Sequence, residues 1–263
     1  MAKISLFIDG KSITADSEST VLEAATQAGI YIPQLCSHPD LKPSGECGLC
    51  AVEIEGTGEP VQACNTKVTD NMIIHTDTDS IRKKQKQALE KILKQHPNAC
   101  LTCWRRERCK PFDICLRNVE VTERCVTCPE NSHCELQQVV DFLDMGNQDI
   151  PYTYRNLPIQ RDNPYFDLDY NLCIACGRCV RACRDLRGIK ALDFKEINGF
   201  KVAGPVKATY QESGCKYCFT CAEVCPVNVI DIVDGKAVVA RPDECIECRA
   251  CEAACPNNAI SFP

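Results

Sequence analysis

The chain has 263 residues, of which 23 are cysteines, about 9% and several times ordinary usage. Without the cysteines, only about 35% of the residues are apolar, which is little for one large hydrophobic core. The net charge of −6 provides no basic surface for nucleic acid, so we expect no nucleic-acid partner. No apolar run approaches the roughly 18 residues of a membrane-spanning helix, so we expect no direct membrane insertion.

The first residues of the chain, 1–7, show neither the basic segment nor the long apolar run of a secretory signal. We therefore expect a cytoplasmic protein, in which thiols stay reduced. Reduced thiols in such numbers indicate metal binding rather than disulfides. The sequence predicts an α+β protein with domains over residues 1–78, 79–150 and 151–263.

Alternating apolar residues predict four strands and one helix in the first domain, over residues 4–8, 11–15, 51–55 and 72–75 and over residues 21–28. Asp9 and Gly10 predict a tight turn between the first two strands. Thr20 predicts the N-cap of the helix. A hairpin, a crossing helix and returning strands make a ubiquitin-like, β-grasp sheet.

An amphipathic helix is predicted over residues 79–95, with an apolar side formed by Ile81, Ala88, Leu89, Ile92 and Leu93. From residue 100 to residue 134 the cysteines are too dense for a conventional core, so ligation must organise this segment. Residues 151–164 are rich in proline and asparagine and predict a linker.

The first candidate ligand set consists of Cys36, Cys47, Cys50 and Cys64. Gly45 and Gly48 flank its central pair and allow backbone N–H groups to approach inorganic sulfide. Four thiolates on a loop of a β-grasp sheet suit a [2Fe-2S] cluster. A structural zinc site is the alternative, although zinc ribbons usually present two close pairs of cysteines.

This spacing resembles that of the N-terminal domain of the large iron-sulfur subunit of respiratory complex I, and of its relatives among NAD-linked hydrogenases and formate dehydrogenases. The resemblance implies that a [4Fe-4S] cluster is ligated by one histidine and three cysteines, namely His96, Cys100, Cys103 and Cys109. A neutral imidazole in place of a thiolate removes one negative charge and raises the reduction potential. The alternative is a histidine that merely follows a helix, as a cap or an exposed residue.

In that family the histidine-cysteine motif runs directly into Cys-Glu-Leu-Gln, whereas here this tail starts at Cys134. The additional cysteines form a further set, Cys115, Cys125, Cys128 and Cys134. Its Cys-x2-Cys-x5-Cys spacing repeats that of the preceding set and favours an extra [4Fe-4S] cluster, with Cys115 as the fourth ligand. A zinc knuckle is the alternative, and His133 is interpreted as a bystander.

The motif Cys-x2-Cys-x2-Cys-x3-Cys occurs three times, at Cys173, Cys176, Cys179 and Cys183, at Cys215, Cys218, Cys221 and Cys225, and at Cys245, Cys248, Cys251 and Cys255. In the bacterial ferredoxin motif, three cysteines hold one cubane and the fourth ligates the neighbouring cluster. A short gap and a turn at Asp234-Gly235 favour pairing the second copy with the third. The resemblance instead favours pairing the first copy with the second.

Together with His96, the 23 cysteines make 24 candidate ligands, or six sets of four. This count corresponds to one [2Fe-2S] cluster and up to five [4Fe-4S] clusters. Arginines stand beside the cysteines, at positions Arg105, Arg106, Arg108, Arg178, Arg181, Arg184 and Arg187. Their charges either stabilise reduced, anionic clusters or form a solvated face.

The sequence contains neither a Gly-x-Gly-x-x-Gly motif after a strand nor a Walker loop, so we expect it to bind neither NAD nor flavin and to hold no substrate-converting site. The resemblance implies a hetero-oligomeric complex in which the chain relays single electrons. On one side, the resemblance implies a flavoprotein subunit that binds NAD(P)H and acts as electron donor or acceptor. The families with such a subunit include electron-bifurcating complexes. On the other side we expect a ferredoxin, a hydrogenase, a formate dehydrogenase or a second flavoprotein. The alternatives are a free-standing polyferredoxin and a zinc-stabilised scaffold.

Overall fold

The fold was analysed in a computed structural model, which describes residues 2–115, 124–146, 148–152, 154–226 and 230–232. The third ferredoxin motif, from Cys245 to Cys255, lies outside the described residues, as does the turn predicted at Asp234-Gly235. None of the 19 described cysteines forms a disulfide. Within the described part of the chain, no helix combines the length and the apolar character that crossing a membrane requires.

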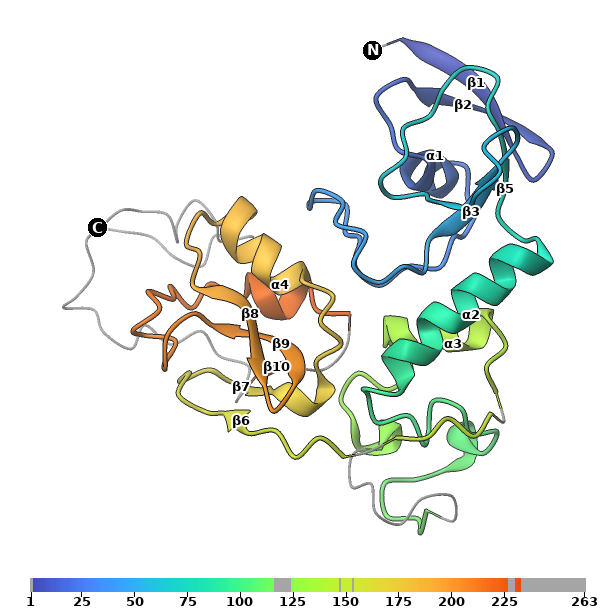
Figure 1. The fold of residues 1–263 in the computed structure, drawn as a ribbon. Coiled ribbons are helices and arrows are strands. Elements are labelled where there is room, and N and C mark those ends of the chain that lie inside the picture. The colour runs from blue at the N-terminus through green and yellow to red at the C-terminus, as the bar shows by residue number, and fades with distance from the viewer. Residues whose placement is uncertain (1, 116–123, 147, 153, 227–229, 233–263) are drawn as a thin grey trace, which may run out of the picture. The chain divides into compact units, whose positions relative to one another are not determined.

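The first domain contains a five-stranded sheet of order β2-β1-β5-β3-β4. Its elements are β1 (Lys3–Ile8), β2 (Lys11–Asp16), α1 (Val21–Gln27), β3 (Ala51–Ile54), β4 (Val61–Gln62) and β5 (Ile73–His75). The central strands β1 and β5 are parallel, whereas the remaining neighbours are antiparallel. Helix α1 crosses this sheet (Figure 1), so the predicted β-grasp fold is confirmed, with β4 as a strand that the sequence pattern missed.

Local sequence signals explain the first half of this sheet. Asp9 and Gly10 have φ values of 50° and 77°, which a two-residue turn between twisted strands requires. Thr20 caps α1 by accepting a hydrogen bond from the backbone of Glu23, and the Glu23 carboxylate accepts one from the backbone of Thr20 in return. The predicted turn and cap are therefore confirmed.

Helix α2 (Asp79–Leu93) ends two residues earlier than predicted. Its buried side includes Ile81, Leu89 and Leu93, each fully buried, as the apolar pattern predicts. The helix also buries a polar residue, Gln85, whose side-chain amide donates to the carbonyl of Ala51 at 3.1 Å. This hydrogen bond fastens α2 to strand β3.

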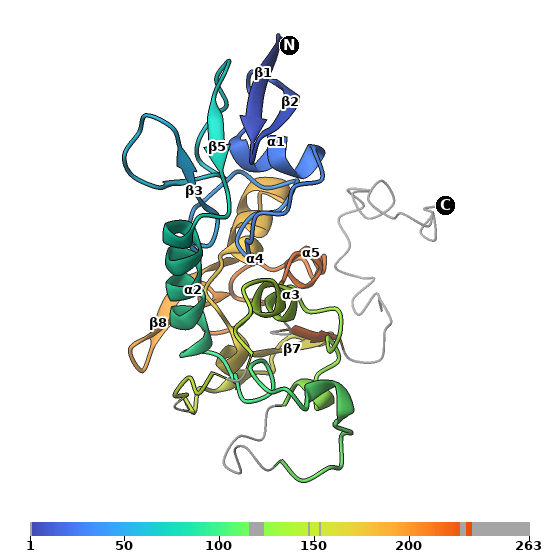
Figure 2. The ribbon, with the colours of Figure 1, turned by 90° about the vertical axis from the view of Figure 1, so that its right-hand side faces the viewer.

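The segment that follows α2, residues 94–150, has little regular structure in its described part apart from helix α3 (Glu135–Phe142). Two single-turn 3₁₀ helices, η1 (Arg106–Arg108) and η2 (Cys125–Thr127), are the other elements in its described part. Helices α2 and α3 pack in one core that also contains Leu35 and Leu49, the neighbours of two candidate ligands. Figure 2 shows these two helices side by side.

The last described part contains two small sheets and several short helices. The strands are β6 (Ile159–Gln160), β7 (Phe166–Asp169), β8 (Leu192–Ile197), β9 (Phe200–Pro205) and β10 (Ile230–Ile232). The helices are η3 (Tyr170–Leu172), α4 (Arg178–Arg181), the π-helical turn η4 (Ala182–Leu186) and α5 (Thr220–Glu223). One sheet has the order β10-β7-β6, and the other is the hairpin of β8 and β9. These elements frame the first two ferredoxin motifs.

The prediction of a linker over residues 151–164 is wrong. Arg155, Leu157 and Asn163 are only 4–5% exposed, and strand β6 pairs with β7. Asn171 holds the segment in place, because its side chain bonds both the N–H and the carbonyl of Leu157 at 2.9 Å. The segment therefore packs as part of the fold.

We predict that Leu89→Ala destabilises the protein by about 2–5 kcal/mol, because a fully buried leucine leaves a cavity when it is truncated. Lys91→Ala, at an exposed position of the same helix, serves as the control and should change stability by no more than about 0.5 kcal/mol. Guanidinium unfolding of anaerobic protein measures both variants. Equal stability of Leu89→Ala and the wild type would contradict the packing described for α2.

Candidate iron-sulfur centres

The four thiols of the first set converge on one loop region of the β-grasp domain. Cys36 pairs with Cys47 and Cys50 with Cys64 through hydrogen bonds between their side chains. The hydrogen bond with Cys47 lowers the pKa of the Cys36 thiol to about 5. Cys36, Cys50 and Cys64 are each 1% exposed. Such a buried group of four sulfurs has the donor chemistry that a [2Fe-2S] cluster needs.

Gly45 shows why this loop requires glycine. Its φ of +71° is rarely adopted by other residues, and an added Cβ would overlap Gln62 Oε1 and lie 2.7 Å from Asn65 Nδ2. The Gln62 amide donates to the carbonyl of Gly45 at 3.1 Å. The positive φ and the nearby Gln62 and Asn65 side chains therefore favour glycine at this position, whereas the approach of its backbone to a cluster sulfide stays a prediction.

His96 has the features of a neutral ligand. Burial lowers its pKa to about 4. Its Nδ1 lies 3.1 Å from the carbonyl oxygen of Pro97, and donation to that oxygen leaves Nε2 as the nitrogen with a free lone pair. Metal-ligating histidines are usually fixed in this way. Ligation of a cluster by His96 remains a prediction.

The two middle cysteine sets lie against one another in space. The thiols of Cys100 and Cys125, one from each set, form a hydrogen bond. One cavity is bordered by four cysteines, namely Cys100, Cys103, Cys109 and Cys115. Cys115 therefore faces the same cavity as the preceding set, and its assignment to either set stays a prediction. His133 is exposed.

The Glu-Leu-Gln tail after Cys134 connects this segment to the next. Glu135 forms a bidentate ion pair with Arg178, in which Nη1 and Nη2 of the arginine lie 2.6 and 2.7 Å from the two carboxylate oxygens, and Leu136 is fully buried. The Gln137 side chain hydrogen-bonds the thiol of Cys125. Each of the three residues thus has a separate packing or hydrogen-bonding role.

In each of the first two ferredoxin motifs, the fourth cysteine lies near cysteines of the other motif. The thiols that act electrostatically on Cys179 include those of Cys176, Cys173 and Cys225, which comes from the second motif. Conversely, Cys183 of the first motif acts on both Cys215 and Cys221. The resulting sets are Cys173, Cys176, Cys179 and Cys225, and Cys215, Cys218, Cys221 and Cys183. The structure thus brings the first and second motifs together, and ligation by these exchanged sets stays a prediction. Within the described residues, no group of three His, Cys, Asp or Glu side chains forms a site for a single metal ion.

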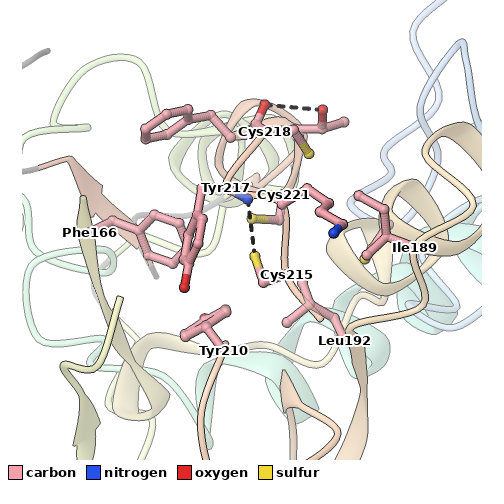
Figure 3. A pocket seen from close by; sticks show the side chains of 12 residues that line it. Phe166, Ile189, Leu192, Tyr210, Cys215, Tyr217, Cys218 and Cys221 are labelled. Atoms are coloured by element: carbon pink, nitrogen blue, oxygen red, sulfur yellow. Dashed lines mark hydrogen bonds between the residues drawn. The ribbon is translucent and has the colours of Figure 1, made fainter. Parts of the chain in front are cut away.

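The second of these sets borders an apolar pocket, shown in Figure 3. Phe166, Ile189, Leu192 and Tyr210 form its walls, together with the four cysteines. The four thiols in an apolar, partly enclosed space provide the donor chemistry and the low polarity of an iron-sulfur site.

Both motifs present the same backbone arrangement. Ala175 and Tyr217 stand two residues after the first cysteine, and each has a φ of 53°. Their N–H groups each donate to the sulfur of that first cysteine at 3.4 Å. Figure 3 shows the second of these bonds. Because a positive φ is unfavourable for residues other than glycine, the folded motif must hold these positions in place.

The arginines beside the cysteines differ in burial. Arg178 and Arg181 are 3% and 6% exposed, and Arg181 donates to the carbonyls of Lys42, at 2.6 Å, and of Cys36. By contrast, Arg184 is half exposed and pairs with its neighbour Asp185. The expectation that guanidinium charge lies beside the cysteine sets therefore applies to Arg178 and Arg181, whereas Arg184 belongs to a solvated face. A third buried arginine, Arg155, lies outside the cysteine motifs and was missed by sequence reasoning.

Comparisons with known proteins identify the domains in which these cysteines lie. Residues 1–79 match the family described as "2Fe-2S iron-sulfur cluster binding domain". Residues 172–229 and residues 214–260 each match a family described as "4Fe-4S dicluster domain". The first dicluster match contains the first and second ferredoxin motifs, and the second contains the second and third.

Similar proteins are subunits or whole chains of oxidoreductases. The chain is 30% identical over 233 residues to the NADPH-Fe(3+) oxidoreductase subunit alpha of Geobacter sulfurreducens, covering 86% of this chain and 24% of that protein. It is 29% identical over 229 residues to the protein named "Probable oxidoreductase YjgC" of Bacillus subtilis, covering 87% of this chain and 21% of that one. The chain therefore spans about a quarter or less of the length of these relatives.

The fold is similar to that of a solved hydrogenase chain. A chain in the crystal structure of an NAD+-reducing [NiFe]-hydrogenase in the H2-reduced state matches with a TM-score of 0.71 and 24% identity, covering 89% of both chains. The chain is thus an iron-sulfur protein, in which a 2Fe-2S domain is followed by 4Fe-4S dicluster domains, as its sequence predicts.

Proposed function

We propose that the chain relays single electrons between a flavoprotein subunit that binds NAD(P)H and a second redox partner. The partner is a ferredoxin or another redox subunit of the same hetero-oligomeric complex. The names of the similar proteins support this proposal, since they include a subunit of an NADPH-dependent oxidoreductase and an NAD+-reducing hydrogenase. The chain's own contribution would be to hold and tune the clusters, and not to convert a substrate.

The observation that carries the proposal is the close connection between successive cysteine sets. Arg181 stands between Cys179 and Cys183 in the chain and donates to the carbonyl of Cys36, so it joins the first ferredoxin motif to the [2Fe-2S] loop. The proximity of Cys183 to the second motif and of Cys225 to the first supports a further connection between these two motifs. A series of adjoining sites is what stepwise electron transfer requires.

The residues present fit iron-sulfur clusters. The [2Fe-2S] cluster would be held by Cys36, Cys47, Cys50 and Cys64, and two [4Fe-4S] clusters by the exchanged sets of the first two motifs. We assign the His96 set, the inserted set of Cys115 to Cys134 and the third motif to up to three further [4Fe-4S] clusters. When bound, the clusters supply reversible one-electron chemistry. The chain's thiolates hold them, its buried N–H groups and arginines adjust their potentials, and its apolar pocket walls exclude water.

Gel filtration of a native, anaerobic extract tests the proposed function. We expect the chain to elute with a flavoprotein in a complex that oxidises or reduces NAD(P)H, and the isolated chain to lack that activity. Iron and sulfide analysis of the purified chain provides the control, with about 22 iron atoms for one binuclear and five cubane clusters. A monomeric brown protein without flavoprotein would favour the free polyferredoxin, and colourless protein with zinc would exclude both electron-transfer functions.

A second prediction concerns the exchange of cysteines. If Cys183 ligates the cluster of the second motif, Cys183→Ala removes the same electron paramagnetic resonance signal as Cys218→Ala. For the same reason, Cys225→Ala matches Cys176→Ala. The single-motif variants Cys176→Ala and Cys218→Ala are the internal controls. A Cys183→Ala spectrum that matches Cys176→Ala would show that each motif holds its own cubane.

A third prediction concerns His96. Replacement by cysteine should preserve the cluster and lower its reduction potential, because a thiolate adds one negative charge to the site. His133→Ala, at an exposed position, is the control and should leave every potential unchanged. The measurement is a redox titration followed by electron paramagnetic resonance. An unchanged or raised potential in His96→Cys would contradict the assignment of His96 as a ligand.

A further inference from the structure

Arg155 is a buried cation in a segment without cysteines. Its side chain is 4% exposed, and its Nε and Nη1 atoms are buried without a hydrogen-bond partner among the described residues. Unlike Arg178, which pairs with Glu135, it has no ion-pair partner in the described part of the chain. Burial of a guanidinium without a nearby anion is costly. A negative charge close to Arg155 would therefore be stabilising, and none of the described side chains supplies one through an ion pair.

The third nitrogen of the guanidinium, Nη2, is firmly held. It donates to the carbonyls of Tyr170, at 2.8 Å, of Cys173, at 3.2 Å, and of Asn171. The guanidinium carbon also lies 5.4 Å from the centre of the Phe200 ring. These contacts fix the group in one place and leave its Nε and Nη1 groups unpaired.

The fixed guanidinium interacts with residues of two candidate cluster sites. It donates to the carbonyl of Cys173 at 3.2 Å, and the sulfur of Cys173, the first expected ligand of the first ferredoxin motif, attracts it. Its charge also acts on His96, the ligand expected for the middle cluster. Tyr152 and Asp169 attract it as well, but the Asp169 Oδ1 already accepts two hydrogen bonds from Asn171, each of 2.8 Å. Burial outweighs these attractions and lowers the pKa of Arg155.

We propose that Arg155 is the counter-charge of the clusters held by the His96 set and by the Cys173 set, and that it raises the reduction potentials of both. Its Nε and Nη1 groups would donate to thiolate or sulfide sulfur of these clusters. A thiolate-ligated cubane is anionic and gains a further negative charge on reduction, so a nearby buried cation favours the reduced state. This proposal rests on the proposed function, because it requires that the clusters are bound.

The alternative role for Arg155 is purely structural, as a clamp on the carbonyls of residues 170–173. The two roles differ in what a lysine can do. Lysine keeps the positive charge, but its side chain ends one bond short of the Nη2 position from which all three carbonyls are contacted. A clamp would therefore be lost in Arg155→Lys as fully as in Arg155→Gln, whereas a counter-charge would be retained in the lysine variant.

The test compares Arg155→Gln, Arg155→Lys and the control Arg161→Gln in the full-length chain, purified anaerobically with its complex. Arg161 has a 65% exposed side chain and pairs with Asp167. Redox titration followed by electron paramagnetic resonance gives the midpoint potential of each cluster. We expect lower potentials in Arg155→Gln for two clusters, one of them the cluster that Cys176→Ala removes. The [2Fe-2S] potential should not move, and Arg155→Lys and Arg161→Gln should remain close to the wild type.

Several outcomes would overturn the proposal. One is full retention of iron in Arg155→Gln with unchanged potentials. If Arg155→Gln loses iron, Arg155→Lys distinguishes the two roles. Loss of the same clusters in Arg155→Lys would establish the clamp and overturn the proposal. Retained clusters with near wild-type potentials would support the counter-charge. Iron and sulfide in the wild-type chain test the proposed function separately. Clusters present in the wild type but insensitive to Arg155 would reject this inference alone.

Discussion

Thiol groups from distant parts of the chain meet in the structure, and this constraint shapes how the described cysteine-bearing segments fold together. Cys183 and Cys225 show it most directly, because each lies beside cysteines of the other ferredoxin motif. Under the proposed function, neither of these two motifs would hold a complete ligand set by itself, so each site would depend on the other being folded. Ligation would then link segments that hydrophobic burial alone would hold weakly, because the chain has few apolar residues outside its cysteines.

The elements that carry the cysteines are correspondingly short. Helices α4 and α5 have four residues each, below the length at which a helix is stable by itself. They are preceded by Gly177 and Phe219, which have φ values of 69° and 59°. A phenylalanine in this conformation is unfavourable unless its surroundings impose it. The conformation therefore reflects the geometry of the ligand loop more than the preference of the residue.

Buried arginines occur where cysteine-bearing segments meet. Arg181 reaches the carbonyl of Cys36, Arg178 pairs with Glu135 next to Cys134, and Arg155 holds the carbonyl of Cys173. A guanidinium can bond several carbonyls while keeping its charge, so it can join loops and offset the negative charge of thiolates at the same time. The same side chains would therefore both hold the cysteine-bearing loops together and set the electrostatic potential at the sites.

Local signals in the sequence determined the β-grasp domain, the turn at Asp9-Gly10, the cap at Thr20 and the cysteine motifs, because each depends on neighbouring residues. Tertiary structure alone decided that Cys183 and Cys225 each lie beside the other motif, since spacing within a motif does not say which other motif is its neighbour. It also decided the burial of Arg155. The polar composition of residues 151–164 indicates a linker, but distant partners, among them Asn171 and Phe200, supply contacts that anchor Leu157 and Arg155 within it.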